Sequence, residues 1–236
     1  ASLIVKSSDE RIRDELWKLM ATRHPDHAIE LLRNTNLLKW ILPEVAALMD
    51  VPQSAPHHLD VYHHTLLAVR HAGFLRDRVL RDNSLSSGHY AESRYANSQP
   101  AILLESTLQQ WSPKLQRHLG PDVAAGHGRG DWLVWLALFH DTGKPQTCTE
   151  ETEQGGQPRY RFFDHESVGA QWTTSRLNAL HFSRDEVQFA ARAVECHMRP
   201  HHLNSSFESN EISRRAKYRF YRNCGQIPGD FMVGID

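Results

Sequence analysis

The chain has 236 residues, of which 40% are hydrophobic and 23% charged, and its formal net charge is −1 at pH 7. This length and apolar content are enough to bury the core of one large domain. The near-zero charge excludes a global basic field that would attract polyanions, so any binding of nucleic acid or nucleotide must come from a local site.

We expect residues 1–50 to form a helical segment that packs on the core, and residues 51–236 to form the main domain. The segment opens with Ser7 and Glu10 at capping-box spacing, after which apolar residues recur at helical intervals. One or two further helices follow and are interrupted before Pro43.

The main domain is predicted to be helical as well. Residues 60–75 and 101–119 have helical patterns, and the polar stretch 82–100 between them is interpreted as a loop insertion without a core of its own. A second loop at 120–130 leads to residues 131–141, which are apolar on all sides. Such a pattern predicts the central buried helix.

A β-hairpin and further helices are predicted after the central helix. The Gly-Gly pair at 155–156 stands between two short alternating runs, which indicates a hairpin. Helices are expected to start near His165 and at Ser183, where a second capping box occurs, and a basic helix covers 211–225. The chain then enters what we expect to be one more helix. The fold class is therefore mainly α with a small β-hairpin.

The cysteines and the apolar runs indicate the compartment. The three cysteines are far apart and form no CxxC motif, so we expect reduced thiols in a cytoplasmic protein. The longest apolar run, 132–139, is too short to span a bilayer. No membrane association is therefore expected, and the sequence does not indicate an oligomeric state.

The predicted central helix ends on the adjacent residues His140 and Asp141. An unpaired buried carboxylate is costly, so Asp141 should have a cationic or metal partner. Taken alone, the dipeptide is better explained as a helix cap that bonds to loop backbone.

Histidines on three other predicted helices change this balance. His64, His165 and His197 each stand at the boundary of an apolar face. A lone inward histidine is usually a satisfied core residue, but three of them beside a buried His-Asp pair favour a metal centre. Asp60 lies one turn before His64, where we expect it to orient the imidazole of His64.

The motifs that carry these residues resemble a known family. They are DVYHHT at 60–65, ALFHDTGKP at 137–145, FFDHESVGA at 162–170 and VECHMRP at 194–200. Together they are similar to the HD superfamily of metal-dependent phosphohydrolases, and more narrowly to the HD region of bacterial tRNA nucleotidyltransferases and poly(A) polymerases. The resemblance covers most of the chain and implies an HD-domain helical bundle.

The resemblance also implies a ligand set. The family's His…His-Asp…Asp pattern matches His64, His140, Asp141 and, by position, Asp236. The histidines that some members use for a second metal match His165 and His197.

Two departures from the family pattern are evident. The chain contains no Gly-Ser step and no Asp-x-Asp motif, which nucleotidyltransferases of this kind require, so CCA addition is not expected of it. The interval between His64 and His140 is long for a compact HD domain, which favours an insertion at 82–100.

A site of this composition would perform phosphoester hydrolysis. Mixed histidine and carboxylate ligation suits Mn, Fe, Co, Ni or Zn better than Mg. Asp141 would bridge two ions or act as general base, and His165 and His197 would ligate a second ion or protonate the leaving group. Lys144 either holds a phosphate oxygen or is an ordinary exposed loop lysine, and both interpretations stay open.

The basic helix offers a weaker signal. Arg215, Arg219 and Arg222 fall on one side of it. A solvated face is the more common explanation of such a pattern, and contact with phosphate or an RNA backbone is the alternative. Tyr218 and Tyr221 could stack a base, but aromatic residues at this spacing more often belong to a core.

Two functions are therefore carried forward. The first is a metal-dependent phosphohydrolase that acts on a nucleotide, a cyclic nucleotide or an RNA end. The second is a non-catalytic, metal-stabilised module that binds RNA or protein. A metal-free helical domain ranks below both.

Overall fold

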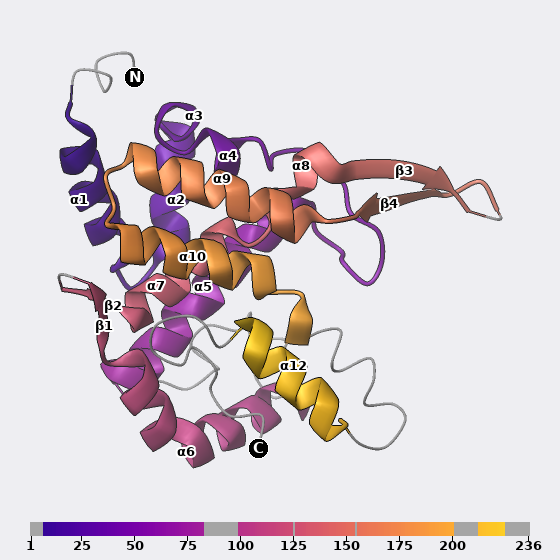
Figure 1. The fold of residues 1–236 in the computed structure, drawn as a ribbon. Coiled ribbons are helices and arrows are strands. Elements are labelled where there is room, and N and C mark those ends of the chain that lie inside the picture. The colour runs from indigo at the N-terminus through magenta and orange to yellow at the C-terminus, as the bar shows by residue number, and fades with distance from the viewer. Residues whose placement is uncertain (1–6, 83–98, 125, 154, 201–211, 225–236) are drawn as a thin grey trace.

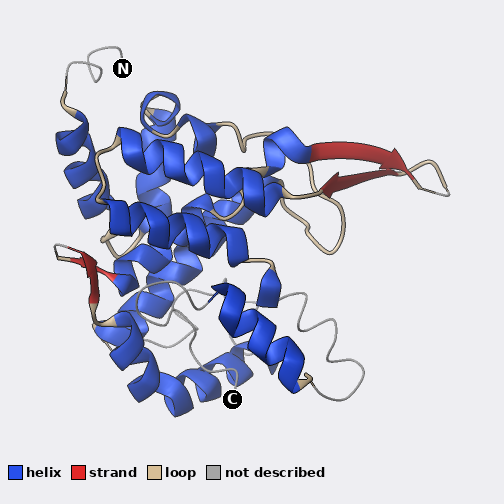
Figure 2. Cartoon of the chain, in the orientation of Figure 1, coloured by secondary structure: helices blue, strands red, loops and turns tan. Residues whose placement is uncertain are grey.

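The computed structural model describes residues 7–82, 99–124, 126–153, 155–200 and 212–224. Its fold is mainly α, with two small two-stranded sheets among these residues (Figure 1; Figure 2). The N-terminal segment contributes α1 (Asp9–Met20), α2 (Pro25–Asn34), α3 (Leu38–Ile41) and α4 (Pro43–Ala46). The main helices are α5 (Val61–Leu80), α6 (Gln99–Leu119), α7 (Arg129–Phe139), α8 (Lys144–Thr147), α9 (His165–Ala179), α10 (Arg184–Cys196) and α12 (Arg214–Cys224).

The predicted central helix is α7, and its burial is confirmed. Its largest side chains, Trp132, Trp135 and Phe139, are fully buried. The helix begins after Gly128 and has Asp131 in its first turn, where a negative charge complements the helix dipole. Helices α5 and α10 pack against it, and α9 packs on α10 (Figure 1).

The N-terminal segment belongs to the same hydrophobic core as α7. Met20, Ile29, Leu42 and Leu48 are fully buried in the cluster that also contains the side chains of α5, α7, α9 and α10. A bidentate ion pair between Glu44 and Arg176 also joins α4 to α9, with nitrogen–oxygen distances of 2.8–3.1 Å.

A buried arginine ties the start of the chain to the central helices. Arg76 on α5 is 1% exposed and donates to the carbonyl oxygens of Met20 and Thr22, at 2.7 and 2.6 Å. Its Nε atom pairs with the carboxylate of Asp77, and the Nη1 atom that donates to Met20 also pairs with the carboxylate of Asp131. Because all of these partners satisfy one buried cation, the network fixes how α1, α5 and α7 meet.

Aromatic packing joins α1 to α7. The ring of Trp17 stacks on Trp135 at 5.9 Å between centroids and meets Trp132 edge-on at 5.4 Å. The ring of Trp17 also stacks on the ring of His127, with 3.8 Å between the centroids. His127 in turn pairs with the buried Glu186 of α10. This cluster therefore links α1, α7 and α10.

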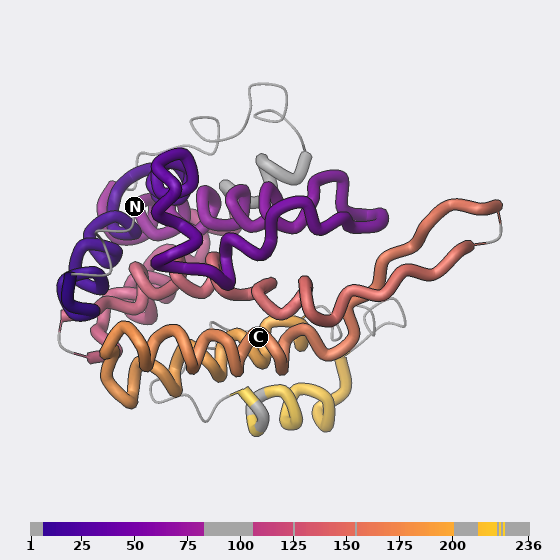
Figure 3. The backbone as a smooth tube through the Cα atoms, turned by 90° about the horizontal axis from the view of Figure 1, so that it is seen from above, coloured from indigo at the N-terminus to yellow at the C-terminus, as the bar shows by residue number. Residues whose placement is uncertain are grey.

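The predicted hairpin is confirmed as β3 (Cys148–Thr152) and β4 (Pro158–Phe162), paired antiparallel from Cys148 opposite Phe162 to Thr152 opposite Pro158. Its turn uses Gly155 and Gly156 at φ +123° and +79°, which other residues rarely adopt. The hairpin projects from the helices in two perpendicular views (Figure 1; Figure 3).

Several predictions of element boundaries were wrong. Helix α1 is capped by Ser8 rather than Ser7, because the Ser8 side chain accepts from the Arg11 N–H. Helix α5 continues to Leu80, five residues beyond the predicted end at 75. The predicted loop at 120–130 contains the short strands β1 (Asp122–Ala124) and β2 (His127–Gly128). Most of the predicted insertion at 82–100, and the helix expected after 225, lie outside the described residues.

Within the part of the chain that the structure describes, the helices lack the apolar length needed to cross a membrane.

Candidate metal centre

Four helices deliver the histidines and the aspartate to one place. His64 lies in the first turn of α5, and His140 and Asp141 directly follow α7. His165 is the first residue of α9, and His197 directly follows α10. Because each group stands at a helix end, the packing of the helices brings the five side chains together.

Asp141 stands between two groups of ligating atoms. Its Oδ2 atom lies 3.0 Å from His140 Nε2 and 3.7 Å from His64 Nε2. Its Oδ1 atom lies 3.5 Å from His165 Nε2, which is 3.2 Å from His197 Nε2. Among the described residues, His64, His140 and Asp141 form one group that could hold an ion, and Asp141, His165 and His197 form another.

Backbone hydrogen bonds orient three of the imidazoles. The Nδ1 atoms of His140, His165 and His197 lie 2.8, 2.8 and 2.6 Å from the carbonyl oxygens three residues earlier. A carbonyl oxygen only accepts, so each Nδ1 must carry the hydrogen. In its neutral form, each ring then presents the Nε2 lone pair to the centre, as in metal-ligating histidines generally.

This tautomer makes the short approach of His165 and His197 informative. Two Nε2 lone pairs 3.2 Å apart, with no hydrogen between them, repel each other. A cation bound between these atoms would relieve this repulsion, and the buried Asp141 carboxylate would balance its charge, so the residues present fit a divalent metal.

The electrostatics favour the neutral imidazole at His64 and at His197. Burial, together with the nearby charge of His140, lowers the pKa of His64 and the pKa of His197 to about 4. At neutral pH both rings therefore offer lone pairs without first losing a proton. Burial also opposes the charged form of His140, but the carboxylate of Asp141 outweighs it and raises the His140 pKa.

The carboxylate itself is held in its charged form. Burial would raise the pKa of Asp141, but the charges and hydrogen bonds of His140 and Lys144 bring that pKa far below its usual value. Asp141 is 1% exposed and ionised, so it depends on these cationic neighbours.

Lys144 is not an exposed loop lysine, so that interpretation was wrong. Its side chain is 7% exposed, and its Nζ atom lies 2.8 Å from Asp141 Oδ2 and 2.7 Å from Gln53 Oε1. The ammonium also lies 5.2 Å from the centre of the Phe162 ring. An ammonium has three N–H donors, so one is left after Asp141 and Gln53.

The role expected for Asp60 was also wrong. Asp60 is the N-cap of α5, and its carboxylate accepts from the backbone N–H and the Nδ1 atom of His63, at 2.8 and 2.9 Å. An N-cap side chain turns toward the first N–H groups of its helix, which directs it to His63 rather than to His64.

Two residues of the loop before α5 lie beside the centre although the sequence pattern does not include them among the site residues. Gln53 holds Lys144, and its Nε2 atom also donates to the Leu59 carbonyl at 3.2 Å. The ring of His57 lies 4.9 Å from that of His64, edge to face. Loop residues show no periodicity, so the only available signal was that they directly precede the helix of His64.

Two glycines allow α8 and α9 to meet beside the centre. A Cβ atom at Gly143 would lie 2.1 Å from the carbonyl oxygen of His165 and 2.6 Å from the Gly169 nitrogen. At Gly169, a Cβ atom would be 3.3 Å or more from its neighbours. The glycine of the HDTGKP stretch is therefore required by a backbone crossing that positions His165.

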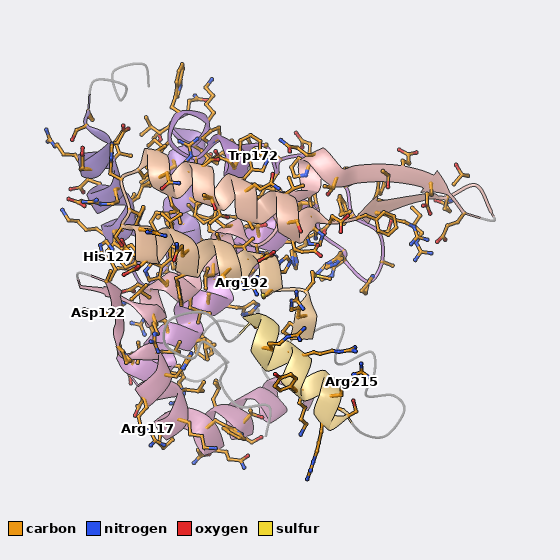
Figure 4. All side chains as sticks on the ribbon, viewed as in Figure 1. Arg117, Asp122, His127, Trp172, Arg192 and Arg215 are labelled. Carbon is orange, nitrogen blue, oxygen red and sulfur yellow. The ribbon has the colours of Figure 1, made fainter. Side chains whose placement is uncertain are left out.

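The remaining predicted site residues are not among the five of the centre, or are not described. Arg215, Arg219 and Arg222 are exposed on α12, where Figure 4 labels Arg215. Tyr218, which the pattern assigned to a core, is 65% exposed. Asp236 lies outside the described residues.

Comparisons with known proteins agree with this geometry. The protein-family model described as the HD domain matches residues 109–221. The family model described as the probable RNA and SrmB-binding site of polymerase A matches residues 1–49. The HD match contains four of the five residues of the centre, and His64 precedes it.

Curated relatives point to the same group of proteins. The CC-adding tRNA nucleotidyltransferase of Thermus thermophilus is 29% identical over 189 residues, or 80% of this chain and 31% of the relative. The A-adding enzyme of Deinococcus radiodurans is 27% identical over the same shares. The Multifunctional CCA protein of Neisseria meningitidis serogroup C is 43% identical over 118 residues, or 49% of this chain and 24% of the relative.

The chain thus spans about a third of the length of the first two relatives. Its segment 109–221 matches the HD-domain family model, and the chain is similar to the HD region of tRNA nucleotidyltransferases and poly(A) polymerases.

Proposed function

We propose that the chain is a metal-dependent phosphohydrolase that cleaves a phosphate ester of a nucleotide, a cyclic nucleotide or an RNA end. The observation that carries the proposal is the position of Asp141, which directs one carboxylate oxygen to each of two histidine pairs. Mixed nitrogen and oxygen ligation favours Mn, Fe, Co, Ni or Zn over Mg.

A divalent ion at this centre would polarise a phosphoryl oxygen and acidify a water molecule. Asp141 would help to hold such an ion and would supply negative charge to it, because it belongs to both groups of ligating residues. Lys144 keeps Asp141 ionised and in place, and its remaining N–H is available to a phosphate oxygen. His165 is 8% exposed and serves as a ligand rather than as the acid for the leaving group.

Substrate reaches the centre over its partly exposed histidines, His64, His140 and His197. The side chains of His64 and His140 are 30% and 19% exposed, whereas Asp141 and His165 are almost fully buried. An accessible coordination position favours catalysis, because structural sites are normally closed by protein ligands. An RNA end as substrate is supported by the RNA-binding match at residues 1–49 and by relatives named for tRNA. Such a protein with three free thiols would work in the cytoplasm.

The alternative is a module that binds RNA or protein around a structural ion. The match at residues 1–49 supports RNA binding whether or not the chain is catalytic. Turnover distinguishes the two functions.

The test is hydrolysis of bis(p-nitrophenyl) phosphate, 2′,3′-cyclic AMP and nucleoside monophosphates with Mn, Co, Ni, Zn or Mg. We expect metal-dependent turnover that Asp141→Asn abolishes. His63→Gln is the matched control, because His63 neighbours His64 on α5 but pairs with Asp60. Turnover should survive this change. No turnover with any metal would leave the binding module as the function.

Metal content gives a second, independent test. We expect two ions per chain, one of which is lost in His64→Gln and the other in His165→Gln, because each histidine serves one group. Asp141→Asn should lose both, since Asp141 is shared. Elemental analysis after gel filtration measures the ratio of metal ions to protein chains. An unchanged metal content in Asp141→Asn would remove the basis of the proposal.

A further inference from the structure

Helix α12 carries a basic and aromatic stripe on its exposed side. Arg215, Tyr218, Arg219 and Arg222 are all exposed and follow one another at i, i+3, i+4 and i+7, which places them on one face. The opposite side is buried: Phe220 and Cys224 pack against Cys196 of α10. One face thus holds the helix in the fold, and the other is presented to solvent. We name the four exposed side chains the α12 stripe.

An ordinary solvated face does not explain this stripe well. Exposed faces usually intersperse both signs of charge, and α1, α2 and α10 do so through pairs such as Lys18–Glu15, Arg33–Glu30 and Arg192–Glu195. Helix α12 contains no acidic residue at all. Arg215 and Arg219 stand at i and i+4, where like charges destabilise a helix. Tyr218, which stands between these arginines and is 65% exposed, adds an apolar surface to the basic face.

The α12 stripe lies close to the candidate metal centre. Cys196, on which α12 packs, directly precedes the ligand His197. A helix with its side chains is about 10–12 Å across, so the end of the stripe at Arg219 and Arg222 stands roughly one helix diameter from the backbone of that ligand. Residues 7–49, the described part of the segment that matches an RNA-binding family model, lie on another side of the molecule in both views (Figure 1; Figure 3).

We propose that the α12 stripe binds single-stranded RNA and guides its end to the metal centre. Guanidinium groups suit phosphate oxygens because they donate two parallel hydrogen bonds, and the Tyr218 ring offers a surface on which a base can stack. Stacking on a protein ring requires an unpaired base, which selects a single strand over a duplex. The proposal rests on the proposed function and specifies its substrate as the end of an RNA strand.

The first experiment measures binding of a labelled single-stranded RNA dodecamer by fluorescence anisotropy, in EDTA and across a range of salt. With about three phosphates contacted, the slope of log K against log salt should be about −2. Arg215→Gln and Arg219→Gln should each weaken binding and reduce the magnitude of that slope by about 0.7. Tyr218→Ala should lose about tenfold in affinity without a change of slope.

Arg184→Gln is the matched control, because Arg184 is an exposed arginine at the far end of α10. It should leave affinity and slope unchanged. The proposal is overturned if the stripe variants behave like this control, or if duplex RNA binds as tightly as the single strand. Displacement of the RNA by an acidic peptide of equal charge and concentration would also overturn it, in favour of an acidic protein partner.

Hydrolysis of bis(p-nitrophenyl) phosphate separates this proposal from the proposed function. That substrate has no strand to lie on α12, so the stripe variants should hydrolyse it as the unmodified protein does. Turnover that persists without stripe-dependent RNA binding refutes the inference alone. RNA binding that depends on the stripe, in a protein that hydrolyses nothing with any metal, refutes the phosphohydrolase and supports the docking surface.

Discussion

Lys144 and Asp141 form a buried ion pair whose two members depend on each other. Replacing Lys144 by Met leaves the Asp141 carboxylate short of one cation in a position that is 1% exposed. We expect the metal-free protein to lose about 3 kcal/mol of unfolding free energy. Added Mn should stabilise this variant more than it stabilises the unmodified protein, because the ion replaces the missing charge.

Urea unfolding with EDTA or with Mn measures both effects. Lys39→Met, at an exposed position on α3, is the control and should change neither value. Equal metal-free stability of Lys144→Met and the unmodified protein would show that the pair is not needed to hold Asp141.

The residues predicted from burial arguments were found more readily than those in loops. Asp141 was expected to need a cationic partner, and the structure provides His140 and Lys144. Helical patterns located His64, His165 and His197 at the edges of apolar faces. Gln53 has no such pattern, because its contact with Lys144 spans 91 positions and exists only after folding.

The crossing of α8 and α9 depends on Gly143. In Gly143→Ala, the new Cβ atom would overlap backbone atoms of His165 and Gly169, which cannot move as a flexible side chain would. We expect a loss of more than about 3 kcal/mol in stability, together with weakened metal binding. Gly169→Ala, where the neighbours stand farther away and alanine favours the helix, should stay within about 1 kcal/mol.

Thermal unfolding and metal titration of the two variants make the comparison. Equal tolerance of alanine at both positions would contradict the close crossing.

Tyr62 joins α5 to α2 and should make stability depend on alkaline pH. Its hydroxyl donates to Glu30 at 3.0 Å, and burial, together with this bond, raises the pKa of Tyr62 above its usual value. The unfolded tyrosine ionises near pH 10, whereas the folded one stays neutral. The stabilisation is therefore complete below about pH 10 and is lost as the pH rises further.

The Tyr62→Phe substitution removes the hydroxyl and with it this dependence of stability on alkaline pH. It should cost about 1 kcal/mol at pH 7, and the difference from the unmodified protein should shrink above pH 10. Chemical unfolding between pH 7 and 11 measures the difference, with Tyr218→Phe at an exposed position as the control. A difference that stays constant over this range would contradict the raised pKa.

Elements with strong periodicity were predicted well, and their ends less so. The capping box at Ser183 and Glu186 is present in the structure, whereas at α1 the same spacing misplaced the cap by one residue. Strands β1 and β2 were missed because elements of two or three residues carry no measurable alternation.

At the scale of the whole molecule, residues 1–50 should unfold together with the rest. Leu42 is fully buried in the common core, whereas Leu31 is 57% exposed. Leu42→Ala should lower the stability of the entire protein by about 2–5 kcal/mol in a single transition. Leu31→Ala should change it by less than about 0.5 kcal/mol.

Circular dichroism and metal release should follow the same curve in Leu42→Ala. Early loss of helix while metal stays bound would show that residues 1–50 form a separate unit.

The contact of Trp17 with Trp135 and His127 also makes the molecule its own optical probe. Three of the six tryptophans meet in one cluster that spans α1 and α7, in which Trp132 and Trp135 are fully buried and Trp17 is partly buried. Indole emission shifts and changes intensity when a ring leaves such surroundings for water. Detachment of α1 would therefore be visible in the intrinsic fluorescence of the unlabelled protein, even while the other helices stay folded.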